Sequence, residues 1–156
     1  MIKDPIIHSI RQSNYFAADE KLAVVVICKK YDQLRTVAGR SAFEDLEEVE
    51  ADRDLVLERL ARLSFTPEEI VLMEDPSYHD MNIYVRELAL KVAKATAADK
   101  NILVFWYYAG HGTQDNTVSM MLNQATGRHS YPIELQLRSL SKCNSAYVVG
   151  LMDCCR

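Results

Sequence analysis

A histidine between two glycines and a cysteine near the end of the chain are the residues best suited to chemistry. His111 lies in the segment 109–112 (AGHG), directly after the apolar run 102–107, and Cys155 follows a second apolar run. A thiol with an ordinary pKa of about 8.5 needs a neighbouring imidazole to become a thiolate at neutral pH. Backbone N–H groups of Gly112 and Cys155 could bind the oxyanion of a tetrahedral intermediate. Either residue alone would more often be a turn histidine or a buried thiol, but together the two predict a nucleophile–base pair on adjacent strand ends.

The segments around these two residues alternate between strand-like and helix-like patterns. Such an alternation predicts an α/β fold with a mostly parallel sheet and helices on both faces. Open sheets of this kind place their ligands at the carboxyl ends of the strands. Five strands are expected, at 21–28, 69–73, 102–107, 117–122 (a small element) and 146–152. Three helices are expected, at 43–63 with a possible start only near Asp52, at 79–96 with Ser77 as N-cap, and from Pro132 through Leu140.

Composition excludes several classes of protein. The 156 residues are 49% apolar, which suffices for the core of one domain, and the net charge of −4 argues against nucleic acid as the main partner. No apolar run reaches 18 residues, so no membrane-spanning helix is expected, and the N-terminal residues 1–16 lack the long apolar region of a secretory signal. The four cysteines fit neither a zinc site nor a disulfide framework, so we expect no metal, no cofactor and reduced thiols in the cytoplasm.

Two motifs resemble those of the caspase-like cysteine peptidases, which comprise caspases, metacaspases and paracaspases. YYAGHG at 107–112 carries the family histidine as His111, and DCCR at 153–156 resembles the nucleophile motif with Cys155 as the nucleophile. His111 precedes Cys155 by 44 positions, near the spacing of about 50 in caspases. The pairing of these motifs is most similar to paracaspases.

The resemblance covers roughly residues 21–156. It implies the large-subunit (p20-type) portion of a caspase-like three-layer α-β-α sandwich, preceded by a weakly patterned leader at 1–20. It also implies a cysteine endopeptidase that acts on protein or peptide substrates through a Cys–His dyad.

Two acidic residues indicate the substrate preference. Caspases that select aspartate use an arginine in the loop before the first helix and a glutamine two residues before the nucleophile. In this chain Leu46 lies near that arginine position, although Arg40 is in the same loop. Asp153 replaces that glutamine, and Asp52 matches an aspartate at the helix start of relatives that cut after Arg or Lys. Two carboxylates in one pocket favour a guanidinium and repel an aspartate. The resemblance therefore implies cleavage after Arg, then Lys, although Asp52 could simply be a carboxylate at a helix N-terminus.

The sequence stops at Arg156, whereas family members continue with a small-subunit region. The resemblance implies that the strand at 146–152 is internal in the complete sheet. We therefore expect a small-subunit region or a second caspase-like chain, such as a second copy in a homodimer, to cover its edge. The alternative function is a catalytically inactive caspase-like scaffold that acts through protein–protein interaction. A nucleotide-binding domain is disfavoured because no glycine-rich phosphate motif follows the first strand.

Overall fold

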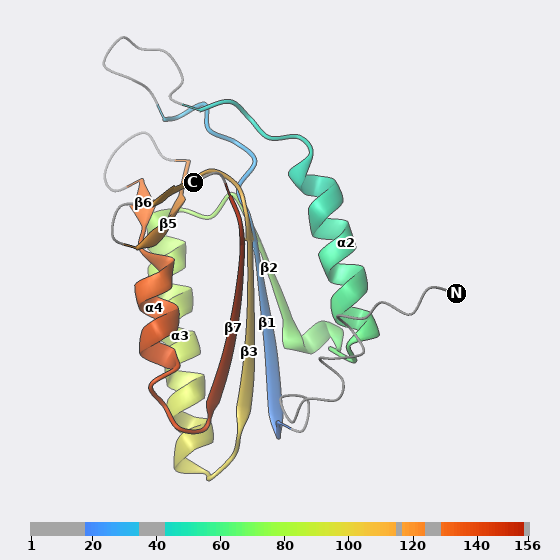
Figure 1. Ribbon diagram of the computed structural model, residues 1–156, viewed down its shortest axis with the longest axis vertical. Helices are drawn as coiled ribbons and strands as arrows, with labels where there is room; N and C mark the ends of the chain where they lie inside the picture. The colour runs from blue at the N-terminus through green and yellow to red at the C-terminus, as the bar shows by residue number, and fades with distance from the viewer. Residues whose placement is uncertain (1–17, 35–42, 115–116, 124–128, 155–156) are drawn as a thin grey trace.

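Four parallel strands form the central sheet of the computed structural model, which describes residues 18–34, 43–114, 117–123 and 129–154. The strands are β1 (Glu20–Ile27), β2 (Ile70–Glu74), β3 (Ile102–Ala109) and β7 (Ala146–Asp153). Their order in the sheet is β2-β1-β3-β7, and every neighbouring pair is parallel. One helix covers one face of the sheet and two helices cover the other, so the α/β sandwich expected from the sequence is confirmed (Figure 1).

β1 and β3 form the centre of the sheet because both are continuous apolar runs rich in β-branched and aromatic residues. The two strands pair along their full length, from Glu20 with Ile102 to Ile27 with Ala109. β3 pairs in turn with β7, and Ala109 lies opposite Asp153. The carboxyl ends of β1, β3 and β7 therefore lie side by side at one edge of the sheet.

The helices pack on the sheet through apolar stripes. α2 (Val49–Arg62) lies on one face, and α3 (Tyr78–Ala97) and α4 (Ile133–Leu140) lie on the other (Figure 1). α3 begins where the sequence predicts, because the Ser77 side chain accepts the Asp80 N–H and the Asp80 carboxylate accepts the Ser77 N–H. This reciprocal capping box satisfies two N–H groups that the first turn of the helix leaves without partners.

Two buried clusters lie on opposite sides of the sheet. The larger cluster packs between the sheet and α3 and α4 and contains Trp106 and Tyr108, whereas the smaller cluster packs under α2 and contains Tyr107. This division follows from the alternation of side chains along a strand. The two tyrosines of the YYAGHG motif therefore extend into different layers of the sandwich.

Several element boundaries differ from the sequence-based expectation. α2 begins at Val49, neither at 43 nor at Asp52, because Leu46 donates its backbone N–H to the Lys29 carbonyl and keeps the preceding segment beside the loop after β1. Pro132 is the N-cap of α4 and not a residue of its first turn. A 3-10 turn, η2 (Pro67–Glu69), precedes β2.

The segment after His111 forms a small antiparallel sheet. Gly112 begins β4 (Gly112–Gln114), which pairs with β5 (Val118–Met121). β5 lies within the predicted small element at 117–122 and pairs with β6 (Ser130–Tyr131). Residues 1–17 of the expected leader lie outside the described residues. Among the described helices, none combines the length and apolar character needed to cross a membrane.

Candidate active site

The ends of β3 and β7 meet at the edge of the sheet where the sequence predicts the catalytic residues. Beyond the last residue pair, the Gly110 N–H donates to the Asp153 carbonyl at 3.2 Å. His111 follows one of these strand ends and Cys154 follows the other. The structure thus shows the adjacency of the two strand ends, whereas the proposed nucleophile Cys155 lies outside the described residues.

Gly112 and Cys154 are in close contact. A Cβ atom on Gly112 would lie 2.6 Å from the Cys154 Sγ and 3.0 Å from its Cβ, so the Cys154 side chain would have to shift to accept it. The absence of a side chain at Gly112 thus allows the close approach of Cys154. The half-buried Cys154 side chain joins the larger core cluster. Cys154, the residue directly before Cys155 in the sequence, is thus packed against the segment that contains His111.

The His111 imidazole lies between two aromatic rings. Its centroid is 4.6 Å from that of Tyr31, in an edge-on arrangement, and 4.7 Å from that of Phe43. The ring Nε2 is 3.0 Å from the backbone carbonyl oxygen of Glu44. Because a carbonyl can only accept, Nε2 carries the proton of this hydrogen bond, and Nδ1 of the neutral ring remains the acceptor. An imidazole in this tautomer can take a proton from a thiol at Nδ1.

Tyrosine hydroxyls hold the main chain of His111 from both sides. The His111 N–H donates to the Tyr31 hydroxyl at 2.9 Å, and the Tyr108 hydroxyl donates to the His111 carbonyl at 2.5 Å. The Met121 N–H donates to the same carbonyl at 2.9 Å. Both polar backbone groups of the candidate base therefore have partners, which limits the freedom of the residue.

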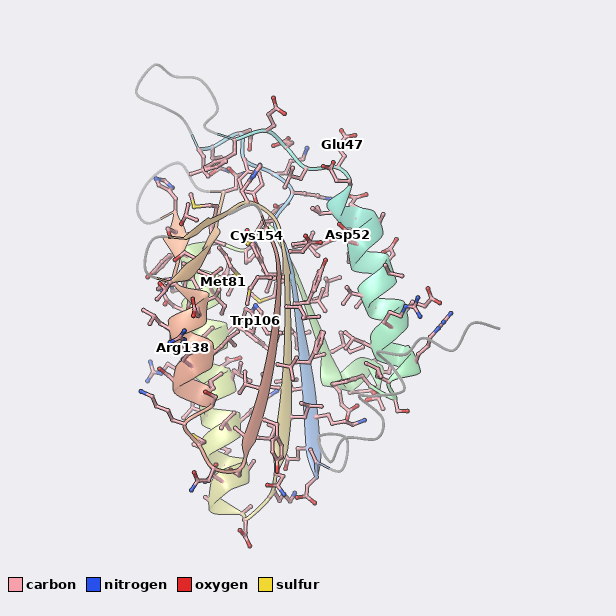
Figure 2. All side chains as sticks on the ribbon, viewed as in Figure 1. Glu47, Asp52, Met81, Trp106, Arg138 and Cys154 are labelled. Atoms are coloured by element: carbon pink, nitrogen blue, oxygen red, sulfur yellow. The ribbon has the colours of Figure 1, made fainter. Side chains whose placement is uncertain are left out.

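Two carboxylates approach one tyrosine on the α2 side of the sheet. The Tyr107 hydroxyl donates to Asp153 Oδ2 in a long hydrogen bond of 3.4 Å. The pKa of Tyr107 is raised by burial first, and then by the negative charges of Asp153 and Asp52. Figure 2 shows Asp52 on α2 at the level of the strand ends. Asp153 is exposed and Asp52 is half-buried, so this acidic pair is open to solvent and can receive a cationic group.

Carboxylates also fix the loop that follows β1. The Asp75 side chain accepts the backbone N–H groups of Lys29 and Lys30, and Asp45 accepts that of Tyr31 at 2.8 Å. The Tyr31 N–H, followed by Lys30, lowers the pKa of Asp45. A surface hollow beside this loop is lined by Lys29, Lys30, Asp45, Leu46, Glu47 and Glu50. It contains neither His111 nor the acidic pair, and four of its charged groups form the ion pairs Lys29–Glu50 and Lys30–Asp45.

Cys28, at the end of β1, is not a second nucleophile. Its side chain is fully buried, and burial, followed by the charge of Asp75, raises the pKa of its thiol to about 12. The thiol is therefore protonated at neutral pH and packs as a small apolar group. Among the described residues, no group of three or more His, Cys, Asp or Glu side chains is arranged to hold a metal ion.

Sequence reasoning missed four contributors to this site, namely Tyr31, Glu44, Tyr107 and Tyr108. The alternation of side chains along a strand could have assigned Tyr107 and Tyr108 to opposite faces. No local pattern identifies Tyr31 or the Glu44 carbonyl, because both reach His111 from distant parts of the chain. Arg40, the other candidate for substrate selection, lies outside the described residues.

Comparison with known proteins assigns the family. A search among curated proteins returned no significant match. A family model described as Caspase domain matches residues 20–156, which include all of the elements described above. The parallel sheet, the helices on both faces and the histidine at a strand end agree with that match. This chain therefore belongs to the caspase domain family of cysteine peptidases.

Proposed function

We propose that this chain carries the catalytic residues of a cysteine endopeptidase that cleaves protein substrates after a basic residue, Arg in preference to Lys. The observation that carries the proposal is the convergence of Asp52 and Asp153 on Tyr107, at the sheet edge that also holds His111. A guanidinium between two carboxylates makes charge-assisted hydrogen bonds, and an aspartate there would be repelled. The motif pairing of YYAGHG with DCCR supports a place in the paracaspase branch.

In the proposed reaction, the Cys155 thiolate attacks the substrate carbonyl carbon. His111 takes the thiol proton and later gives it to the leaving amine, so that an acyl-enzyme forms and water then hydrolyses it. The backbone N–H groups of Gly112 and Cys155 bind the oxyanion. The contact between Cys154 and Gly112 supports this assignment because Cys154, the residue directly before the proposed nucleophile, lies beside the histidine segment.

The unpaired side of β7 supports a partner for this chain. Within the described residues β7 pairs only with β3, and Val149 and Leu151 are 37% and 50% exposed. A β-prone segment with an open edge and exposed apolar side chains favours the addition of another strand. We propose that a small-subunit region or a second caspase-like chain, as in a homodimer, covers it and completes the pocket. The proposed reaction uses no nucleic acid, membrane or metal. The proposed location of the protein is the cytoplasm, where thiols stay reduced.

The same exposed strand favours the alternative, an inactive scaffold that acts through protein–protein contacts. A thiol-reactive peptide probe that ends in Arg separates the two functions in the full-length protein. Covalent labelling that disappears in Cys155→Ala and is weaker for a matched probe ending in Asp supports the peptidase. Absence of labelling in folded protein, with the small-subunit region present, supports the scaffold.

A further inference from the structure

Tyr31 connects three separate parts of the site although it lies 80 positions before His111. Its side chain is fully buried at the end of β1. Its hydroxyl donates to the Cys28 carbonyl at 2.9 Å and accepts the His111 N–H at 2.9 Å. Because burial raises the pKa of this hydroxyl, it is protonated at neutral pH and can make both bonds.

Gly110 allows two hydroxyls to approach the turn before His111. A Cβ atom at this position would lie 2.6 Å from the Tyr31 hydroxyl and 2.6 Å from the Tyr108 hydroxyl. The φ angle of Gly110 is +153°, which side-chain-bearing residues rarely adopt. The two tyrosine hydroxyls thus occupy the space that a side chain at position 110 would need.

The loop that holds Tyr31 also holds the group that orients the imidazole. The Asp45 carboxylate accepts the Tyr31 N–H, and the adjacent residue, Glu44, provides the carbonyl that accepts from His111 Nε2. Figure 1 shows the segment after β1 and the segment before α2 together above the sheet. The Tyr31 ring also packs edge-on against the imidazole. One connected unit therefore contacts both the main chain and the ring of His111.

We propose that Tyr31 is a positioning residue for His111, holding the backbone of the base through its hydroxyl and the imidazole through its ring, with Asp45 keeping Tyr31 and Glu44 in register. The inference rests on the proposed peptidase function but concerns residues outside its reacting groups. A base that moves by a fraction of an ångström transfers protons less efficiently, whereas substrate binding at the acidic pair is unaffected.

Tyr31→Phe tests the hydroxyl because it keeps the ring and removes only the oxygen. In the full-length protein we expect kcat on an Arg peptide to fall about tenfold, with KM changed less than about twofold. We also expect the His111 amide hydrogen to exchange at least about tenfold faster. Tyr84→Phe is the matched control, because the Tyr84 hydroxyl is buried with no hydrogen-bond partner among the described residues, and neither quantity should change.

Asp45→Ala provides a second variant that does not disturb the core, since Asp45 is exposed. Like Tyr31→Phe, it should lower kcat at constant KM. Glu48→Ala is the control and should leave kcat unchanged, because Glu48 is an exposed acidic residue without a capping hydrogen bond. Unchanged exchange of the His111 amide in folded Tyr31→Phe overturns the positioning role, and so does faster exchange with unchanged kcat. An inactive wild-type protein would contradict the proposed function instead, and amide exchange would still decide whether Tyr31 holds His111.

Discussion

β3 and β7 are adjacent parallel strands of equal length that end at the two halves of the proposed dyad, yet their surroundings differ. β3 lies between β1 and β7, and seven of its eight residues are buried. β7 has no buried residue, and within the described chain it has a neighbour on one side only. In the described part of the chain, the histidine therefore follows a strand that is almost entirely buried, and the cysteine pair follows a strand with no buried residue.

This difference indicates how the site is divided. Hydrogen bonds and rings from the chain itself hold His111, so the proposed base is positioned without a bound substrate. β7, the strand before the proposed nucleophile, has exposed apolar side chains, and fewer buried contacts stabilise its conformation. The partner proposed above to cover β7 would complete the cysteine side of the site while the histidine side stays unchanged.

The largest effect should come from the cysteine pair. Cys155→Ala should reduce turnover of an Arg peptide by at least about 10³-fold because it removes the thiolate that attacks the carbonyl carbon in the proposed reaction. Cys154→Ala should lose less than about tenfold, since Cys154 packs against Gly112 and the core. Peptide hydrolysis by both proteins is the measurement, and full activity of Cys155→Ala would end the assignment.

A matched pair of leucines tests the difference in packing. Leu103 on β3 is 3% exposed, and Leu103→Ala should lower the free energy of unfolding by about 2–5 kcal/mol. Leu151 on β7 is 50% exposed, and Leu151→Ala should lower it by less than about 1 kcal/mol. Denaturant unfolding measures both. Equal losses would show that the β7 face is already covered in solution.

The acidic pair tests whether β7 contributes to substrate selection. Leaving a bound guanidinium without its carboxylate costs about 2–5 kcal/mol, so Asp153→Asn should lower kcat/KM on Arg peptides on the order of 10²-fold. Asp54→Asn, on the same helix as Asp52 but paired with Arg53, is the control and should have little effect. The specificity constants for Arg, Lys and Asp peptides are compared. A preference for Asp before the cut would refute the acidic pocket and direct attention to Arg40.

The smallest expected effects are changes in unfolding free energy when Gly110 or Gly150 is replaced by alanine. Gly110→Ala should cost about 2 kcal/mol of unfolding free energy, because the residue has a positive φ and two hydroxyls occupy the space of a Cβ. Gly150→Ala on β7 should cost less than about 1 kcal/mol, since a Cβ there meets only the flexible side-chain ends of Leu137 and Met152. Thermal unfolding ranks the two variants, and a more damaging change at Gly150 would reverse the comparison.

The amino-acid sequence by itself determined the elements whose signals are local. Continuous apolar runs predicted β1 and β3, and Ser77 as N-cap predicted the start of α3. The α/β class followed from the order of these elements, and the parallel order predicted that the ends of β3 and β7 lie together. Each of these inferences depends only on residues close together in the sequence or on the general rules for how consecutive strands and helices connect.

Only the tertiary structure decided where α2 begins and what surrounds His111. Local polarity cannot show that the residues before Val49 are bound to the loop after β1, because the Leu46–Lys29 and Asp45–Tyr31 hydrogen bonds join separate segments. The same holds for Tyr31, whose hydroxyl meets the His111 N–H across 80 positions of sequence. Periodicity describes which face of an element is apolar. Which distant groups become partners depends on how the layers pack, since a buried N–H or C=O takes whichever acceptor or donor the folded chain brings within reach.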